Sequence, residues 1–407
     1  MQVVYRRCCG IDVHKRTIVA CLSIGGKREL REFGTTTSEI KVLANWLIES
    51  ECEMIAMEST GVFWKPLYNL FELLGLEAIV VNASHMKALP GRKTDAKDAE
   101  WISDLLRHGL LKASYIPNRE QRELREIARY RKSLIEERSR EINRLQKVLE
   151  SANIKLDSVV KDINGKSARK LLDKIIANEA PDSEEVSAII HGKLRPKLDR
   201  IMESIEGITT SLQRRLIAGI VDHIDDMTKR IADMDDLIRE YMADYESAIE
   251  AIDALPGIAR RSAEVIIAEI GSDMSRFPSA AHLCSWAGVA PGNNKSAGKS
   301  GSGKTTKGNK ALKTVLTQCA KAAKNCKGSY FSAQYQRIAV RRGKNRATIA
   351  VAHSMLIAIY HVLKNGIPFH DLGSDYYDNF NRKHKIKGYL KRLEALGWAP
   401  ESDALPA

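Results

Sequence analysis

A heptad pattern in the middle of the chain constrains its fold more than any other feature of the sequence. The pattern predicts one long α-helix with a continuous apolar stripe, because its apolar residues are separated by alternating steps of three and four. The residues of this stripe are Ile217, Ile220, Ile224, Met227, Ile231, Met234, Ile238, Tyr241 and Tyr245. Such a stripe needs a partner helix. An intramolecular helical hairpin and a stalk between subunits both satisfy that need.

A second long helix is expected at residues 119–150, which are highly charged and carry a weaker apolar seam. Arg131 and Arg138 interrupt this seam. Residues 151–196 contain Gly and Pro at intervals, which indicates shorter elements between the two long helices. We therefore expect a helical coiled-coil region over residues 116–248.

Residues 1–115 have a different pattern, typical of an α/β domain. Five strands are expected at 8–13, 17–24, 30–35, 54–57 and 77–81, and helices at 38–49, 63–74 and 94–107. Ser38 is expected to cap the first of these helices. The order of three strands, helix, strand, helix, strand and helix is that of a ribonuclease-H-like sheet.

Four carboxylates occupy informative places in this layout. Asp12 lies within the first strand and Glu58 closes the fourth, whereas Asp95 and Asp98 share one face of the last helix. Asp12 is costly to bury in a strand without a partner. Together the four acids could hold two Mg²⁺ ions, which clamp the attacking and leaving oxygens during phosphodiester cleavage.

The alternative for these acids is a structural role, since a carboxylate is favoured at a helix N-terminus. A further acid of the last helix, Asp104, is not expected to join these four carboxylates. Asp104 is nine residues beyond Asp95, which at about 100° per residue places it on the opposite face of the helix. We therefore leave Asp104 out of the expected metal site.

The segment between Asp273 and Asp371 contains sixteen Lys and Arg and no Asp or Glu. Its charge exceeds the formal net charge of +13 of the whole 407-residue chain. Cations at this density repel one another unless a polyanion is the partner. Apolar stretches flank the Gly/Ser/Lys loop at 293–308 on both sides, which argues against a disordered basic tail. The segment therefore predicts binding to nucleic-acid phosphates.

Residues 254–271 resemble a helix-hairpin-helix, in which a glycine turn offers backbone N–H groups to a phosphate. Gly257 supplies one turn glycine, and Ala259 replaces the usual second one. With the cations of the acid-free segment, the expected nucleic-acid-binding residues are Arg260, Arg261, Lys295, Lys299, Lys304, Lys307, Lys310, Lys313, Arg341 and Arg342.

Residues 298–305 also match the P-loop pattern G-x-x-x-x-G-K-[ST]. A P-loop requires a buried strand before the loop and a helix after it. Residues 290–297 do not have the pattern of a strand, and no apolar run ending in Asp follows. The sequence therefore disfavours an NTPase.

The seven Cys residues are an odd number and form no C-x-x-C pair, which argues against a zinc ribbon or a disulfide scaffold. A reducing compartment is favoured for the same reason. The N-terminus has no apolar signal region, and no apolar run approaches the length of a membrane span. We expect a cytoplasmic protein without a membrane partner.

Several short motifs occur in order along the chain, namely GIDVHK at 10–15, MESTG at 57–61, KTDAKDA at 93–99, LPGI at 255–258 and AGVAPGNNKSAGK at 287–299. In these motifs the chain resembles the transposases of the insertion sequence 110 family, from Gly10 to about Asp371. The resemblance implies a RuvC-like DEDD catalytic domain at 1–115, a serine transposase domain at 249–372 and a C-terminal tail at 373–407.

Carried over to this sequence, the acidic tetrad of the family becomes Asp12, Glu58, Asp95 and Asp98. The nucleophilic serine becomes Ser296 in the S-x-G-K motif, and Ser300 and Ser302 in the same loop remain alternatives; the motif's Lys295 and Lys299 are adjacent cations. The resemblance implies DNA recombination through a covalent phosphoserine, with Mg²⁺ as cofactor. It also implies double-stranded DNA and a structured noncoding guide RNA as partners.

Two other functions remain open. The tetrad alone would suit a metal-dependent RuvC-like nuclease in which the serine is idle, and the basic segment alone would suit an architectural nucleic-acid binder. Recombination must act on more than one duplex end, so we expect a homo-oligomer, either a dimer or a tetramer. We expect the apolar stripe from Ile217 to Tyr245 to join its subunits.

Overall fold

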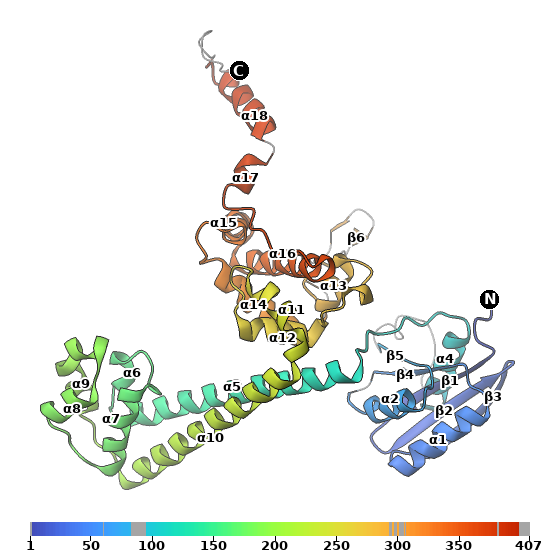
Figure 1. Cartoon of the computed structure of the whole chain (residues 1–407), viewed down its shortest axis with the longest axis horizontal. Coiled ribbons are helices and arrows are strands. Elements are labelled where there is room, and N and C mark those ends of the chain that lie inside the picture. The colour runs from blue at the N-terminus through green and yellow to red at the C-terminus, as the bar shows by residue number, and fades with distance from the viewer. Residues whose placement is uncertain are drawn as a thin grey trace. The chain divides into compact units, whose positions relative to one another are not determined.

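The computed structural model of the protein describes residues 2–59, 61–82, 95–292, 295–296, 299–300, 305, 307–380 and 382–398. The chain divides into two compact units, Met1–Arg119 and Glu120–Ala407 (Figure 1). The first unit is α/β and the second is mainly helical, so the expected fold class is confirmed at this level. The finer division of the second unit at residues 249 and 373 stays a prediction.

The described part of unit 1 contains one five-stranded sheet in the order β3-β2-β1-β4-β5. β1, β2 and β3 form an antiparallel meander, and β4 and β5 continue the sheet parallel to β1. The elements are β1 (Arg7–Val13), β2 (Thr17–Ile24), β3 (Lys27–Gly34), α1 (Thr37–Glu49), β4 (Met54–Glu58), α2 (Trp64–Leu73), β5 (Ala78–Val81) and α4 (Asp95–Arg107).

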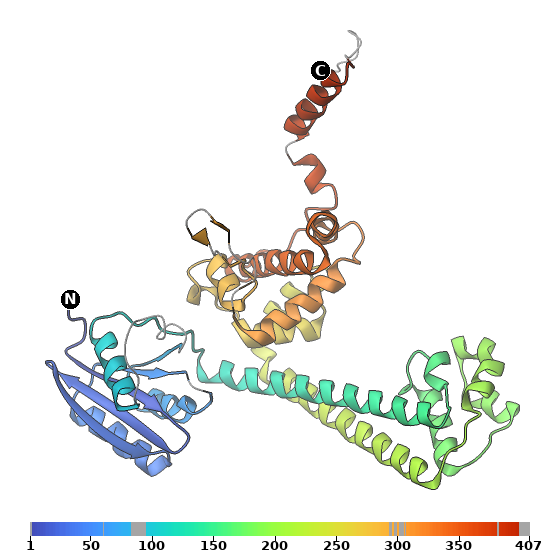
Figure 2. The same ribbon diagram turned by 180° about the vertical axis from the view of Figure 1, so that it is seen from behind.

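The two faces of this sheet are covered by different helices (Figure 2). Cys9, Ile11 and Val13 of β1 pack with α1 and α2 in one core cluster. Cys8 of β1 and Ala56 of β4 pack with α4 on the other side. This alternation follows from the two-residue period of a strand and assigns each β1 side chain to one face.

The cap of α1 differs from the expectation. Thr36, not Ser38, is the N-cap residue, and its hydroxyl accepts a hydrogen bond from the backbone N–H of Glu39 at 3.5 Å. Ser38 lies within the first turn, where its Oγ is 3.0 Å from Oγ1 of Thr36. The run of three threonines before Ser38 offered several caps, and the helix begins at the earlier position.

In its described residues, unit 2 is built from helices and one short hairpin. Its elements are α5 (Arg119–Ser151), α6 (Leu156–Val159), α7 (Lys166–Ala177), α8 (Ser183–Ile189), η1 (Gly192–Lys197), α9 (Leu198–Ile205), α10 (Ser211–Tyr241), η2 (Ala243–Tyr245), α11 (Glu246–Asp253), α12 (Arg260–Ile270), η3 (Met274–Arg276), α13 (Ala280–Ala287), β6 (Lys295–Ser296), β7 (Lys299–Ser300), α14 (Lys310–Ala323), α15 (Tyr330–Arg342), α16 (Lys344–Asn365), α17 (Tyr376–Asn379) and α18 (Arg382–Ala395).

α5 and α10 form an antiparallel hairpin within one chain (Figures 1 and 2). Arg131 of α5 bonds Asp235 of α10, and Gln213 near the start of α10 bonds Ser151 at the end of α5. Most of the apolar stripe is buried in this single chain, namely Ile217, Ile220, Ile224, Met227, Ile231 and Ile238. The expectation that the stripe joins subunits was therefore wrong, because the chain itself covers it.

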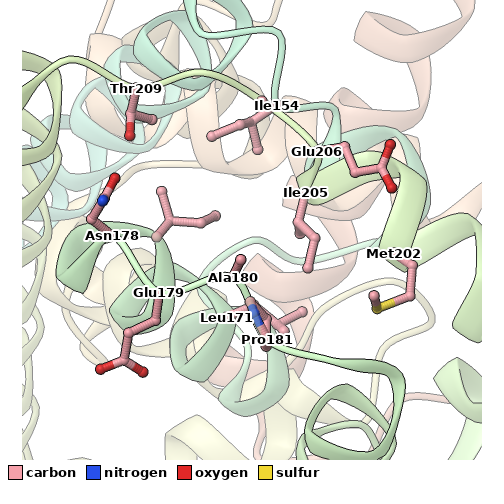
Figure 3. Close-up of a pocket in the computed structure, with 12 residues that line it drawn as sticks. Ile154, Leu171, Asn178, Glu179, Ala180, Pro181, Met202, Ile205, Glu206 and Thr209 are labelled. Carbon is pink, nitrogen blue, oxygen red and sulfur yellow. The ribbon is translucent and has the colours of Figure 1, made fainter.

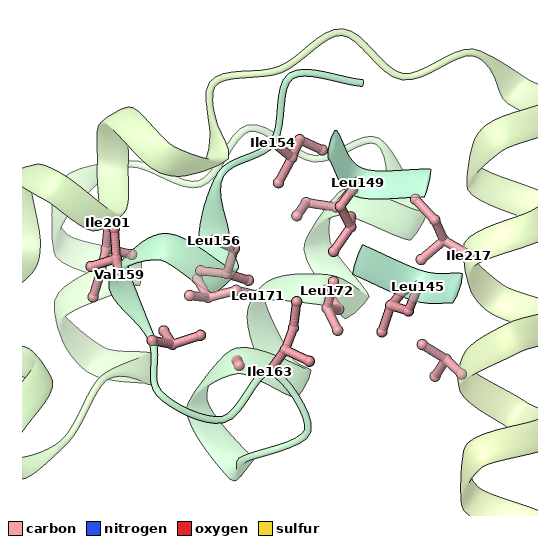
Figure 4. Close-up of a cluster of buried hydrophobic side chains, with 14 of the residues drawn as sticks. Leu145, Leu149, Ile154, Leu156, Val159, Ile163, Leu171, Leu172, Ile201 and Ile217 are labelled. Carbon is pink, nitrogen blue, oxygen red and sulfur yellow. The ribbon is translucent and has the colours of Figure 1, made fainter. Parts of the chain in front are cut away.

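Short helices α6 to α9 pack around the far end of the hairpin (Figure 4). Leu145 and Leu149 of α5 meet Leu171 and Leu172 of α7 and Ile217 of α10 there, all buried. This cluster confirms that residues 151–196 form shorter elements. It also closes the end of the hairpin, because the connecting elements bury apolar side chains from both long helices.

α16 is the central helix of the remaining part of unit 2, with α13, α14 and α15 against it. By length and composition alone this helix, Lys344–Asn365, is long and apolar enough to cross a membrane. The expectation that no run approaches a membrane span was wrong in this respect. Half of its most apolar stretch is buried inside the unit, as for the core helix of a helical domain. All seven Cys residues are free thiols.

Candidate functional site

Asp12 and Glu58 lie side by side at the carboxyl ends of two parallel strands. Ile11 pairs with Met57 in the register of β1 and β4, so Asp12 and Glu58 are the next residues along each strand. Both belong to the face that α4 covers, because Cys8 and Ala56 on the same alternation pack with α4. Asp12 is only 5% exposed. The sheet therefore brings together the two strand acids that the sequence singled out.

Gly10 fixes where α4 crosses this face. A Cβ atom at Gly10 would lie 2.2 Å from the backbone nitrogen of Ser103 and 2.4 Å from the carbonyl oxygen of Ala99, so only glycine permits this approach. The helix runs antiparallel to β1, since the N–H of Val4, before β1, bonds the carbonyl of Arg107 at the end of α4. Moving from Gly10 toward Asp12 therefore leads toward the start of α4.

That start carries the other two acids. Ala99 and Ile102 are fully buried against the sheet, and Asp95 and Asp98 are one helical turn before them. Two residues of strand rise about 6.6 Å and one helical turn about 5.4 Å, so Asp12 is level with this first turn. The Asp98 side chain is half-buried. The Asp95 side chain lies outside the described residues.

Two further residues near the four acids differ in their contacts. Asp104 lies apart from the acids, and His14 contacts one of them. Asp104 pairs with Arg28 of β3 at 2.8 Å, apart from the four acids, as its helical position predicted. Nε2 of His14 is 3.0 Å from Oδ2 of Asp12. The sequence patterns give His14 no role, although it stands two residues after Asp12 in the motif GIDVHK. It is the neighbour of Asp12 that sequence reasoning missed.

Among the described side chains, no group of three or more His, Cys, Asp or Glu stands close enough to hold a metal ion. The Asp95 side chain was not part of that search, since it lies outside the described residues. Carboxylate oxygens are the ligands that Mg²⁺ prefers. The backbone thus brings Asp12, Glu58 and the first turn of α4 to one edge, and the donor chemistry suits a hard divalent cation.

The Gly/Ser/Lys loop joins α13 to α14. Its two sides meet in a bridge between Pro291 and Thr305, and β6 and β7 form a tight antiparallel hairpin in which Ser296 pairs with Lys299. The side chains of Lys295, Ser296, Lys299 and Ser300, and all of Ser302 and Lys304, lie outside the described residues. So does most of the P-loop-like stretch at 298–305.

The described cations of the acid-free segment differ in their surroundings. Lys307 and Lys310 are exposed at the N-terminus of α14, where the helix dipole adds positive potential. Lys313 is half-buried, and its ammonium donates to the Thr305 hydroxyl at 2.6 Å. Arg341 and Arg342 are exposed in the last turn of α15, where a cation also offsets the negative end of the helix. Of these cations, Lys307 and Lys310 combine exposure with a helix N-terminus.

Arg260 and Arg261 are engaged by carboxylates. Arg260 donates two hydrogen bonds to Glu246, at 2.5 and 2.7 Å, and these bonds raise the pKa of Arg260 above its usual value. Arg261 pairs with Asp235 of α10. The expectation that both arginines face a phosphate is not supported by these contacts, because their charges are already balanced.

The turn between α11 and α12 is also packed. Gly257 has φ +89°, and a Cβ there would lie 2.5 Å from the backbone nitrogen of Ala323 in α14. The glycine therefore lets the turn approach another helix closely. This contact accounts for Gly257 without a phosphate, although residues 246–270 do form the helix, turn and helix that the motif predicts.

A pocket of about 390 Å³ lies among the short helices at the far end of the hairpin (Figure 3). Ile154, Ile205 and Met202 supply apolar walls, and Glu179 and Glu206 stand at its edge. Its described lining contains no Lys or Arg. Lys174, which is not among the lining residues, pairs with Glu179 at 2.6 Å. A lining with carboxylates and no cation of its own disfavours a phosphate, so we do not assign this pocket to the nucleic-acid interface.

Comparison with known families agrees with this layout. A family model described as "Transposase" matches residues 9–154, and a second, described as "Transposase IS116/IS110/IS902 family", matches residues 249–336. The chain belongs to the IS110 family of transposases. The first match contains all four acids, and the second contains the loop with Ser296 and the N-terminus of α14.

Two curated relatives support the assignment to the IS110 family. The chain is 26% identical over 297 residues to the "Insertion element IS110 uncharacterized 43.6 kDa protein" of Streptomyces coelicolor, covering 68% of this chain and 72% of that protein. It is 24% identical over 332 residues to the "Putative transposase y4qE" of Sinorhizobium fredii, covering 76% and 70%. As an IS110-family transposase, the protein is an enzyme that binds and acts on DNA, and its DEDD domain indicates a divalent cation.

Proposed function

We propose that this transposase cuts and rejoins double-stranded DNA through a covalent phosphoserine at Ser296, assisted by a divalent cation. The observation that carries the proposal is the buried carboxylate of Asp12, next to Glu58 and the first turn of α4. Asp12 is 5% exposed and has His14 at 3.0 Å, and a bound cation would further offset the cost of burying its charge. The strand order of unit 1 also supports a ribonuclease-H-like domain.

The residues that would hold Mg²⁺ are Asp12, Glu58, Asp95 and Asp98. When bound, Mg²⁺ stabilises negative charge on the attacking and leaving oxygens of a phosphodiester. Asp12 and Glu58 would be fixed ligands because they stand on neighbouring strands of a buried sheet. The two aspartates would be oriented by α4, whose position Gly10 sets. Rigid ligands of this kind reduce the reorganisation that the reaction requires.

The proposed chemistry assigns the nucleophile to the short hairpin β6–β7. The Ser296 oxygen attacks phosphorus, forming a phosphoserine ester, and the deoxyribose oxygen leaves and takes up a proton. Attack by a hydroxyl of another DNA end reverses these bonds and frees the serine. The ester conserves the energy of the cleaved bond, so rejoining needs no ATP. Lys295 and Lys299, which flank Ser296, would offset charge on the phosphate.

The acid-free segment is the proposed nucleic-acid interface. Lys307 and Lys310 are exposed at a helix N-terminus that follows the serine loop, an arrangement that favours anions. Lys304 and Arg341 with Arg342 would extend this surface. We assign it double-stranded DNA and, from the family resemblance, a structured noncoding guide RNA that selects the DNA ends. Removal of RNA during purification should then abolish site choice, and adding the element's own RNA back should restore it.

The proposed assembly is a homo-oligomer that works in the cytoplasm. Two DNA ends must be joined, so at least two serines are needed. The apolar stripe of α10 is covered within the chain, and the subunit contact must therefore use other surfaces. A dimer or tetramer on DNA, measured by light scattering, tests this assignment.

Trapping a covalent adduct on a nicked suicide substrate tests the nucleophile. Wild-type protein should form a protein–DNA adduct that maps to Ser296. Ser296→Ala removes one oxygen, so it should bind DNA normally and form no adduct, whereas Ser296→Cys should retain slow activity because a thiolate still attacks phosphorus. Ser300→Ala and Ser302→Ala are the matched loop controls and should form the adduct. Recombination by Ser296→Ala at the wild-type rate would show that the assignment is wrong.

A metal-dependent nuclease without a serine intermediate is the second candidate. The grouping of Asp12, Glu58 and the start of α4 favours it, because these acids alone suit hydrolysis. Cleaved DNA with free ends and no protein attached, in wild type and Ser296→Ala alike, would establish this alternative.

A further inference from the structure

A buried carboxylate in unit 2 holds the end of the serine loop. Glu269, in the last turn of α12, is 1% exposed. Arg129 of α5 donates two hydrogen bonds to it, at 2.8 and 2.9 Å, and Nε of Arg125 is 3.6 Å from Oε2. The amide of Asn309 donates to the same Oε2 at 2.6 Å. One carboxylate thus joins α5, α12 and the residue that starts α14.

Asn309 has a second role at the same point. Its side-chain oxygen accepts a hydrogen bond from the backbone N–H of Leu312 at 3.0 Å, so it is the N-cap of α14. Its own backbone N–H donates to the carbonyl of Trp286 at 3.1 Å. Asn309 therefore ties the end of the loop to the last turn of α13, where the loop begins.

The two sides of the loop are in close contact at this base. A Cβ at Gly308 would lie 2.3 Å from the backbone nitrogen of Gly288, so the backbones touch. The guanidinium of Arg125 lies 5.5 Å above the ring centre of Trp286. Arg125 and Arg129 are one turn apart on α5. Arg125 contacts the α13 side of the loop base directly through Trp286, and both arginines are linked to Asn309 on the other side through Glu269.

Stability alone does not account for Glu269. The residue is buried, and it stands at the C-terminus of α12, where the helix dipole is unfavourable to a carboxylate. Replacing a buried ion pair by apolar residues is often neutral or stabilising. The carboxylate instead fixes the position of Asn309, because its oxygens bind both the Asn309 amide and two arginines of α5. Asn309 is the last residue before α14, so these contacts fix the base of the loop that carries Ser296.

We propose that Glu269 is a positioning residue, which sets the orientation of the β6–β7 hairpin for attack by linking Asn309 to Arg125 and Arg129. The inference rests on the proposed function of Ser296. A displacement of a reacting group by about 1 Å can cost about 100-fold in rate. Loss of the link should therefore slow formation of the phosphoserine more than it weakens binding of DNA.

A donor–acceptor exchange tests the link. Asn309→Asp keeps a good N-cap but places a second carboxylate against Glu269, so the adduct should form roughly 10–100 times more slowly, with the DNA dissociation constant within about threefold of wild type. Adding Glu269→Gln provides an amide that donates to the carboxylate at 309. The double variant should recover most of the lost rate. No recovery, in a double variant as stable to urea as wild type, overturns the proposal.

Glu264→Gln is the matched control. Glu264 is on the same helix, is similarly buried, and bonds Arg131 of α5 at 2.9 Å, but Arg131 reaches neither side of the loop base in the described contacts. The Glu264→Gln variant should lower the midpoint of urea unfolding without slowing formation of the adduct. If Glu264→Gln slows adduct formation as much as Asn309→Asp does, the effect is one of general stability and the proposal fails.

Limited trypsin digestion separates this proposal from the proposed function. Cleavage after Lys295, Lys299 and Lys304 should be faster in Asn309→Asp and return toward wild type in the double variant. If wild-type protein forms no adduct, the proposed function fails, and the trypsin pattern alone then decides whether Glu269 orients the loop. Equal cleavage in wild type and Asn309→Asp overturns it.

Discussion

Gly10 of β1 and Ser103 of α4 are in backbone contact: a Cβ at Gly10 would lie 2.2 Å from the Ser103 nitrogen. No rotation of a side chain can relieve such a contact, because both partners are main chain. The pair sets the distance between the sheet and α4. It thereby sets where the first turn of α4, with Asp95 and Asp98, meets the ends of β1 and β4.

Gly10→Ala should push α4 away from the sheet. We expect it to destabilise unit 1 by about 1–3 kcal/mol and to abolish metal-dependent DNA cleavage, since the acids of α4 would move from those of the strands. Gly34→Ala is the control, because the atom nearest its added Cβ is the flexible side chain of Glu39. Urea unfolding and a cleavage assay measure both effects. Wild-type cleavage by Gly10→Ala would contradict the role assigned to this contact.

The acidic group should be needed for chemistry and not for binding. Asp12→Ala, Glu58→Ala and Asp98→Ala should each abolish strand cleavage with little loss of DNA affinity, because the proposed ligands face a cation. Asp104→Ala loses only a half-exposed pair with Arg28, worth about 0–1 kcal/mol, and should cleave normally. Cleavage with varied Mg²⁺ is the measurement. Full activity of the unmodified protein in EDTA would rule out the metal site.

Affinity for DNA should fall steeply as salt rises, with a slope of roughly −0.9 per phosphate neutralised. Neutralising Lys304, Lys307 and Lys310 together should make the slope less steep, by up to three times this amount if each lysine neutralises one phosphate. Arg260→Ala is the matched control and should leave it unchanged, since Glu246 already balances that charge. Titrations at several salt concentrations test both. A slope that is equal in wild type and the triple variant would place the interface elsewhere.

The buried stripe of α10 should stabilise each subunit and should not hold subunits together. Ile224 is fully buried, so Ile224→Ala should cost about 2–5 kcal/mol in unfolding free energy without changing the mass of the free protein. Leu212→Ala, at a position 73% exposed on the same helix, should change stability little. Urea unfolding and light scattering distinguish the cases. A stable variant of halved mass would restore the view that this stripe joins subunits.

Local patterns predicted most elements and their order. The five strands and the two long helices followed from periodicity. Periodicity and the motifs of the family also placed Asp12 and Glu58 on strands and Asp95 and Asp98 on the last helix of unit 1. Helix caps were less certain, because Thr36 and Ser38 offer the same hydrogen bond to a nearby N–H. His14 had no signal beyond its place in a motif, since its contact with Asp12 depends on how the chain leaves β1.

The sequence by itself determined which segments are strands and helices, where the cations gather, and which acids stand on the ends of elements, because these depend on neighbours along the chain. Only the tertiary structure decided which charges are balanced and which apolar stripe is covered. Arg131 meets Glu264 across 133 residues, and Asn309 meets Glu269 across 40. No local period encodes such pairs, since they arise when the packing of buried apolar faces brings distant segments together.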